Sequence, residues 1–311
     1  MPNCKMPLLI AHRGASGYLP EHSLAAKALA FGQGADYLEQ DVVASRDGEL
    51  LVLHDPWLEN VSDVANRFPG RARPDGHYYC LDFDLAEIRQ LQFGERINPE
   101  TGTEYFPGRF KRNAAVFQVN TLAEEIRFIE SLNKSAGRNV GIYPEIKDPE
   151  WHLEQGVDLT ALVISELDEF GYLEAGSRMY LQCFDAETLK RVRKQVGTQV
   201  QLVQLLGSSV PVDDAMLSSI ASYANAIGPS IKLIYKGQDA SGQRVLTNLV
   251  SRAHELKLKV HPYTFRADAL PDGINNFDDL LTLFINQQCV DGLFTDFTDL
   301  VAEYIQAQPS T

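Results

Sequence analysis

Long apolar runs are missing from this 311-residue sequence. No stretch approaches the ~20 consecutive apolar residues that cross a bilayer, so we expect no stable membrane insertion. Residues 1–7 also lack the charged segment followed by an apolar stretch that marks a signal peptide. This leaves two locations open, the cytoplasm or, for a processed chain, an exported compartment.

Cysteine is scarce as well. The four cysteines, Cys4, Cys80, Cys183 and Cys289, form no CxxC pair, which argues against a structural zinc site. Cys183 and Cys289 lie in or beside apolar runs, where we expect buried thiols. The scattered spacing does not favour a disulfide bond.

Basic residues are fewer than acidic ones. The chain has 28 Lys and Arg against 42 Asp and Glu, a formal net charge of −14. Such a surface repels polyphosphate backbones, so we expect no nucleic acid partner. A small anionic substrate remains compatible with this charge, provided that arginine, lysine or a metal ion makes its site locally positive.

Short β-rich apolar runs alternate with amphipathic segments along most of the chain. This alternation is typical of parallel α/β folds. The predicted strands are 8–13, 36–45, 49–54, 140–147, 178–184, 200–206, 225–229, 258–264 and 292–297. The predicted helices between them are 22–33, 121–133, 158–170, 185–195, 213–223, 244–256 and 277–287.

Nine strands are one too many for an eight-stranded barrel, and the connection between 36–45 and 49–54 resolves the conflict. It is the tripeptide Arg46-Asp47-Gly48, and an Asp-Gly step is a strong hairpin signal. The two runs should therefore pair antiparallel, with Glu39 and His54 brought near each other. We predict a (β/α)8, or TIM, barrel formed by a single domain over 1–311, in which strand 2 extends into a β-hairpin.

Residues 56–120 break the alternation. They are rich in Arg, Asp, Gly and Pro, and a segment of this length between strands 2 and 3 predicts an insertion. The helical stretch 84–93 favours an ordered insertion on the active-site side of the barrel.

Three carboxylates are predicted at the ends of adjacent strands. Glu39 and Asp41 are two positions apart on strand 2 and so face the same side, and Glu145 ends strand 3. Buried together, these groups would repel one another unless a cation lay between them. Oxygen ligands favour Ca²⁺ or Mg²⁺ over zinc. The alternative is that the carboxylates face solvent or pair with arginine.

Two histidines are predicted at the same rim. His12 ends strand 1 and His54 ends the hairpin. A lone histidine in such a place is more often structural, but two that converge suit the two proton transfers of phosphodiester cleavage. Asp55 could orient His54, while Arg13 and Lys147 supply positive charge for phosphoryl oxygens.

The turn after strand 1 has a less specific pattern. Its glycines in 14–17 lack the Walker spacing and are better explained by a tight turn. Glu21 precedes a predicted helix, where it either caps that helix or reaches the site, and we favour the site.

Taken together, the motifs resemble those of the glycerophosphodiester phosphodiesterases, most closely the periplasmic bacterial members. The resemblance covers nearly the whole chain and is carried by 11–23 (AHRGASGYLPEHS), 34–41 (GADYLEQD), 52–55 (VLHD), 143–147 (YPEIK), 181–185 (LQCFD), 260–264 (VHPYT) and 292–297 (GLFTDF).

The resemblance implies a metal-dependent hydrolase of glycerophosphodiesters such as glycerophosphocholine and glycerophosphoethanolamine. It implies Ca²⁺, or alternatively Mg²⁺, on the three carboxylates, with His12 and His54 as acid and base and Phe294 against the glycerol carbons. The products would be sn-glycerol 3-phosphate and an alcohol. Either the glycerol 2-hydroxyl or water could be the nucleophile. A periplasmic location follows by resemblance, and a monomer or homodimer is expected.

Two rival functions remain. One is a phospholipase D-like lyase that acts on intact lipids, against which the insertion and the acidic surface argue. The other is a binding protein on an inactive barrel, which should lack an acid, a base or a metal ligand. Each of these roles has a candidate residue here.

Overall fold

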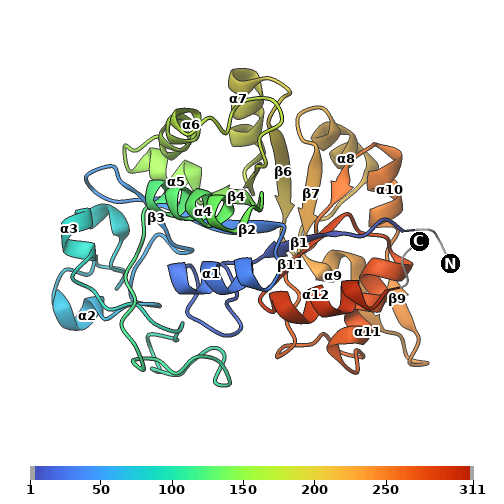
Figure 1. Cartoon of the computed structure of the whole chain (residues 1–311), viewed down its shortest axis with the longest axis horizontal. Helices are drawn as coiled ribbons and strands as arrows, with labels where there is room; N and C mark the ends of the chain where they lie inside the picture. The colour runs from blue at the N-terminus through green and yellow to red at the C-terminus, as the bar shows by residue number, and fades with distance from the viewer. Residues whose placement is uncertain (1–3, 309–311) are drawn as a thin grey trace.

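The computed structural model describes residues 4–308, and its centre is a nearly closed barrel of eight parallel strands (Figure 1). The strands are β1 (Leu8–Ala11), β2 (Tyr37–Ala44), β4 (Gly141–Ile146), β5 (Tyr180–Cys183), β6 (Gln201–Leu206), β7 (Ala226–Pro229), β10 (Lys259–Val260) and β11 (Gly292–Thr295). They pair in the order β10-β7-β6-β5-β4-β2-β1-β11. The circuit closes beyond β10, where Phe265 bridges Thr295 and the Phe294 amide donates to the Pro262 carbonyl at 3.1 Å. The predicted (β/α)8 barrel is confirmed.

Helices cover the outside of the barrel, between successive strands and, for the last helix, after the final strand. They are α1 (Leu24–Gly32), α4 (Leu122–Ala136), α5 (Pro149–Glu154), α6 (Leu159–Glu169), α7 (Ala186–Val196), α8 (Asp214–Ala221), α10 (Leu249–Glu255), α11 (Phe277–Leu281) with a π-helical continuation η2 (Thr282–Gln287), and α12 (Thr298–Gln306). The Ser23 side chain caps α1, and Thr121 with Glu124 forms a capping box at the start of α4. None of the described helices combines the length and apolar character needed to cross a membrane.

The predicted hairpin is present and sets the position of His54. β3 (Leu50–Val52) pairs antiparallel with β2, with Val42 opposite Val52. The turn depends on Gly48, whose φ of +84° favours glycine. The Leu53 amide donates to the Asp41 carbonyl at 2.9 Å, which returns the chain to the barrel rim just before His54.

The insertion after β3 is ordered, as predicted. It contains α2 (Val64–Arg67), the 3-10 helix η1 (Cys80–Asp82) and α3 (Leu85–Ile88). Figure 1 shows α2 and α3 on the same side of the molecule as β3. A separate hydrophobic cluster, which includes Leu58, Phe83 and Ile88, joins the insertion to Val43 and Leu51 of the hairpin. Of the stretch 84–93 that was predicted to be helical, only residues 85–88 form a helix.

Residues 235–246 differ from the prediction. They form a small antiparallel hairpin, β8 (Tyr235–Gln238) with β9 (Arg244–Leu246), which follows the short helix α9 (Ile231–Ile234). The Asp239 side chain accepts from the amides of Ser241 and Gln243 and so stabilises the turn. The helix predicted over 244–256 therefore begins only at 249, because its first residues pair as a strand.

The expectation for Cys289 is wrong. Cys289 forms a disulfide with Cys4, with 5.0 Å between the Cα atoms, while Cys80 and Cys183 are buried free thiols. β1 and β11 are neighbours in the barrel, so the residues that precede them meet although they are 285 positions apart. Spacing along the sequence could not show this proximity.

Candidate functional site

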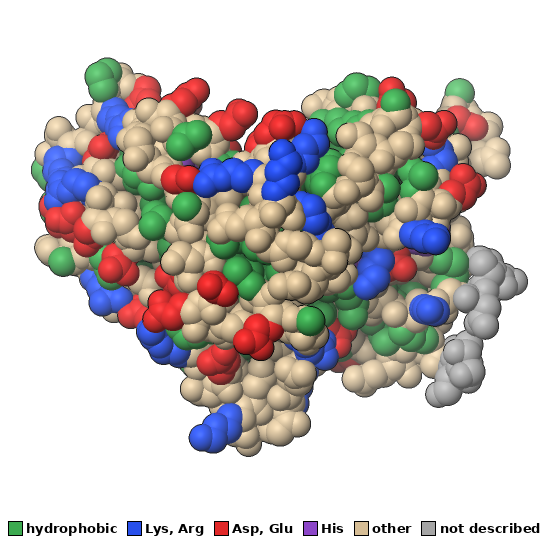
Figure 2. Space-filling view, turned by 90° about the horizontal axis from the view of Figure 1, so that it is seen from above, with side chains coloured by type: hydrophobic (Ala, Val, Ile, Leu, Met, Phe, Trp, Pro, Cys, Tyr) green, Lys and Arg blue, Asp and Glu red, His purple; other side chains and the backbone are tan. Residues whose placement is uncertain are grey.

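A cavity of about 840 Å³ opens at the carboxyl ends of the barrel strands. Side chains that the sequence placed at strand ends line it, namely His12, Arg13, Glu39, Asp41, His54, Glu145, Lys147 and Phe294. Glu21 and Asp55, which were also assigned to the site, lie outside this lining. The surface seen from above mixes acidic and basic side chains rather than presenting one continuous basic face (Figure 2).

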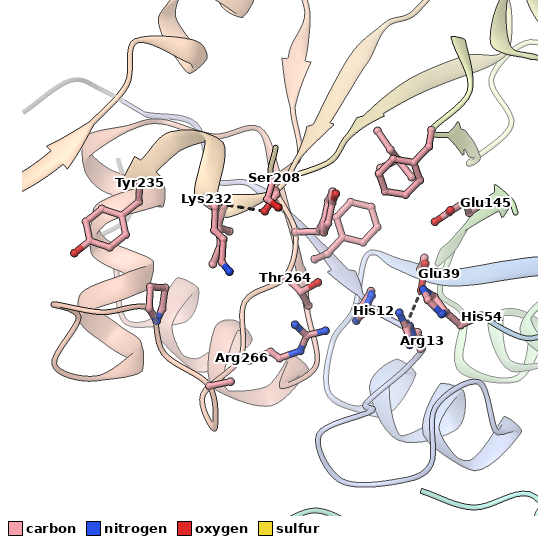
Figure 3. Close-up of a pocket in the computed structure, with 18 of the residues that line it drawn as sticks. His12, Arg13, Glu39, His54, Glu145, Ser208, Lys232, Tyr235, Thr264 and Arg266 are labelled. Carbon is pink, nitrogen blue, oxygen red and sulfur yellow. Dashed lines mark hydrogen bonds between the residues drawn. The ribbon is translucent and has the colours of Figure 1, made fainter. Parts of the chain in front are cut away.

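Each of the two histidines is held at Nδ1 by a carboxylate. His12 Nδ1 lies 2.6 Å from Asp296 Oδ1, and His54 Nδ1 lies 2.5 Å from Asp55 Oδ1. A carboxylate accepts, so both rings carry a proton on Nδ1, which leaves Nε2 for chemistry in the cavity. Figure 3 shows both rings at the same end of the pocket, beside Arg13 and Glu39.

Both histidines have lowered pKa values, which favour the neutral imidazole. Burial, together with the neighbouring Arg13, lowers the pKa of His12 to about 4 and that of His54 to about 3. At neutral pH each Nε2 is therefore a free acceptor until an anion enters. A neutral ring can accept a proton from a nucleophile, and a nearby negative charge favours its protonated form, which can donate one.

The three predicted carboxylates lie on adjacent strands and are buried. Asp41 on β2 is in register with Glu145 on β4, and Glu39 is two positions before Asp41. Burial and the nearby Asp41 raise the pKa of Glu39 well above its ordinary value, and the same two causes raise the pKa of Glu145 to about 8. Burial acts in the same direction on Asp41, but Lys147 and His54 outweigh it and hold the pKa of Asp41 well below its usual range.

This crowding of acids fits a divalent cation. Ligand atoms of His22, Glu39 and Asp41 lie within 4.8 Å of one another, and His22 Nδ1 is buried without a hydrogen-bond partner in the described structure. A cation among these groups would relieve the repulsion that raises the pKa of Glu39. Glu145 lies outside this close group and accepts from Lys147 Nζ at 2.8 Å, so its role as a ligand stays a prediction.

The sequence pattern indicated no site role for His22, which lay at the start of a predicted helix. In the structure, His22 Nε2 lies 2.8 Å from Asp41 Oδ2. The available signal was its position in the same turn as Glu21, a turn that begins at the end of β1.

Arg13 and Lys147 bring positive charge to the cavity. The Arg13 amide donates to Glu39 Oε2 at 2.6 Å, and its guanidinium donates to Glu21 at 3.0 Å. Arg96 of the insertion contacts the other oxygen of Glu21 at 2.6 Å. Glu21 neither caps α1 nor lines the cavity; it lies behind Arg13 and orients it.

Asp296 is the centre of a second ion network. Arg109 and Arg266 both donate to its Oδ2 at 2.7 Å while Oδ1 binds His12. The two arginines come from irregular segments, so no periodic pattern marked them. Phe294, two residues earlier on β11, is buried in the cavity floor, with its ring edge-on to Tyr143 at 5.0 Å.

Comparisons with known proteins agree with this geometry. The family model described as the glycerophosphoryl diester phosphodiesterase family matches residues 12–300. A glycerophosphodiester phosphodiesterase of Haemophilus influenzae is 38% identical over 96% of this chain and 90% of the relative. One of Treponema pallidum is 32% identical over 96% of this chain and 91% of the relative.

Solved structures share the fold. A putative glycerophosphoryl diester phosphodiesterase from Silicibacter pomeroyi superposes with a TM-score of 0.72 at 21% identity, covering 98% of this chain and 94% of the other. An Oleispira antarctica phosphodiesterase in complex with the product sn-glycerol-3-phosphate gives 0.66 at 21% identity, covering 97% and 98%.

Proposed function

The chain belongs to the glycerophosphoryl diester phosphodiesterase family, and we propose that it hydrolyses glycerophosphocholine, glycerophosphoethanolamine and similar diesters to sn-glycerol 3-phosphate and an alcohol. The general activity, hydrolysis of a glycerophosphodiester, comes with family membership. The product bound to the Oleispira antarctica phosphodiesterase supports the proposed product. The observation that carries the proposal is the pair of histidines, each fixed at Nδ1 by a carboxylate, in one cavity with a buried group of acids.

His12 and His54 divide the proton transfers between them. One Nε2 accepts the proton of the attacking hydroxyl, and the other donates a proton to the leaving alcohol oxygen. Asp296 and Asp55 stabilise the imidazolium that forms in each transfer, because they accept from Nδ1. Whether the glycerol 2-hydroxyl or water attacks is decided by trapping or excluding a cyclic glycerophosphate intermediate.

Glu39, Asp41 and Glu145, joined by His22, would hold a divalent metal, for which we propose Ca²⁺ with Mg²⁺ as the alternative. When bound, such an ion supplies Lewis-acid stabilisation of the phosphoryl oxygens. The buried carboxylates, two with raised pKa values, support a cation here because they are otherwise mutually repulsive.

Arg13 and Lys147 bind the phosphoryl group, and Phe294 orients the glycerol. Both cations line the cavity beside the histidines, and their charges persist at neutral pH because acidic neighbours outweigh burial and raise both pKa values. The buried Phe294 ring offers an apolar surface to the glycerol carbons.

Substitution of each histidine tests the proton-transfer scheme. His12→Ala and His54→Ala should each lower kcat by at least about a hundredfold, since a positioned proton donor or acceptor contributes ~10²–10⁴-fold. His254→Ala is the matched control, because His254 lies outside the cavity lining, on α10, and pairs with Asp291. If either cavity variant retains more than about a hundredth of the wild-type rate, the two-histidine scheme is wrong.

We also propose that the protein works in an oxidising compartment, consistent with a periplasmic location. The Cys4–Cys289 disulfide supports this, because such bonds persist in oxidising surroundings and are rare in the cytosol. Titration of thiols in unfolded protein from its native source should give two reactive groups without reductant and four with it. Four without reductant would contradict the proposal.

A further inference from the structure

The cavity continues well beyond the reacting groups. In Figure 3, His12, Arg13 and His54 occupy one end, Lys232 and Tyr235 lie toward the opposite end, and Arg266 lies between. We call this opposite end the far lobe. Its lining includes Lys232, Tyr235 and Lys236, and Asp272 lies beside them, because the Tyr235 hydroxyl donates to the Asp272 carbonyl at 2.7 Å.

The charge of the far lobe is unlike that of the chain as a whole. Lys232 and Lys236 are exposed on its wall, and among residues 4–308 neither ammonium takes part in an ion pair or a side-chain hydrogen bond. Lys232 extends into the pocket in Figure 3. Lys232 and Lys236 outnumber the acidic Asp272 here, so the lobe is locally positive in a protein whose net charge is −14.

Two aromatic side chains of the cavity, Phe184 and Tyr263, already have partners within the protein. Lys147 Nζ already lies over the ring of Phe184, 5.8 Å from its centroid. Tyr263 meets the Phe184 ring edge-on and donates its hydroxyl to the Leu206 carbonyl at 3.1 Å. A choline group in this lobe would lie beside the ammonium groups of Lys232 and Lys236, whose like charge opposes its binding.

We propose that the far lobe is an anion-binding subsite for the alcohol portion of the substrate, so that the preferred diesters are those whose alcohol carries its own phosphate. This inference rests on the proposed function, because the reaction end must hold the scissile phosphate. Lys232 and Lys236 then donate to the second phosphate. The hairpin β8–β9 supplies Lys236 to the wall of this lobe.

A comparison of two substrates tests the subsite. One is bis(glycerophospho)glycerol, whose leaving alcohol bears a phosphodiester, and the other is glycerophosphocholine, whose leaving alcohol is cationic. The double variant Lys232→Ala/Lys236→Ala should lose about tenfold in kcat/KM for the first, the factor expected from two solvent-accessible charge contacts. It should gain modestly for the second, because two like charges near choline are removed.

The double variant Lys134→Ala/Lys194→Ala is the control. It removes the same charge from exposed positions on the outer helices α4 and α7 and should leave both substrates unchanged. The advantage of wild-type protein for the doubly charged substrate should also shrink as salt is raised.

The outcomes separate the subsite from the proposed function. If wild-type protein cleaves both substrates but the far-lobe variant keeps the same ratio of kcat/KM values, the subsite is refuted and the proposed function stands. An equal shift in the control variant would also refute it, because a general charge effect would then explain the ratio. If wild-type protein hydrolyses neither substrate, both the subsite and the proposed function are wrong.

Discussion

Replacing Asp296 by asparagine tests whether activity depends on the tautomer and orientation of His12, because the variant keeps the His12 ring itself. Asp296 is 1% exposed and receives three contacts of 2.6–2.7 Å, from His12 Nδ1, Arg109 and Arg266. An asparagine keeps the shape but loses the charge, and its amide can donate to Nδ1. The ring would then carry its proton on Nε2, the wrong tautomer for accepting one in the cavity.

The expected loss is large and falls on kcat. An Asp-to-Asn change that inverts a histidine tautomer costs up to ~10⁴-fold, which corresponds to about 5 kcal/mol of transition-state stabilisation. For Asp296→Asn we expect a decrease in kcat of about 10²–10⁴-fold with KM within severalfold, because Arg13 and Lys147, the residues proposed to bind the phosphoryl group, are unchanged. Steady-state release of glycerol 3-phosphate measures both constants.

Asp268→Asn is the matched control. Asp268 also binds Arg109, at 2.8 and 3.1 Å, but among residues 4–308 it makes no hydrogen bond to His12. It should change kcat by less than threefold, while thermal unfolding confirms that both variants are folded. A kcat for Asp296→Asn within tenfold of wild type, or an equal loss in the control, would refute the role assigned to Asp296.

Three further predictions concern stability and metal binding. Lys27→Met removes the cation that pairs with the buried Glu125, whose Oε1 lies 2.5 Å from Lys27 Nζ, so denaturant unfolding should show a loss of about 3–5 kcal/mol; a loss below 1 kcal/mol would contradict it. Burial, helped by nearby acids, raises the pKa of Glu166 to about 7, so the folded state loses stability as pH rises from the ordinary value of 4.5 through 7. Glu166→Gln should therefore be neutral at pH 4 and stabilising by about 1 kcal/mol at pH 8, a figure reduced for partial exposure; a pH-independent difference in unfolding free energy would refute this. His22→Ala should weaken divalent-metal binding about 10–100-fold by calorimetry, and unchanged affinity would remove His22 from the metal site.

The sequence predicted the parts of the site that lie on regular strands. His12, Glu39, Asp41 and Glu145 interrupt apolar runs at strand ends, where parallel-barrel topology brings them to one rim. His54 was placed through the Asp47-Gly48 turn, since a two-strand hairpin fixes register locally. These positions depend on short-range rules, so a single sequence was enough.

The remaining parts depend on contacts between distant segments. Arg109 comes from the irregular insertion, and its approach to Asp296 is set by how the insertion packs. Cys4 and Cys289 meet because the barrel closes between β1 and β11. The hairpin β8–β9 was not predicted, because residues 244–246 also fit the helical period of the residues that follow them.

The most direct test is release of sn-glycerol 3-phosphate from glycerophosphocholine by purified protein, with EDTA and with Ca²⁺ restored afterwards. We predict release that EDTA abolishes and Ca²⁺ restores, with no turnover of intact sphingomyelin. Release of phosphocholine instead of glycerol 3-phosphate, turnover of sphingomyelin alone, or hydrolysis insensitive to EDTA would contradict the account.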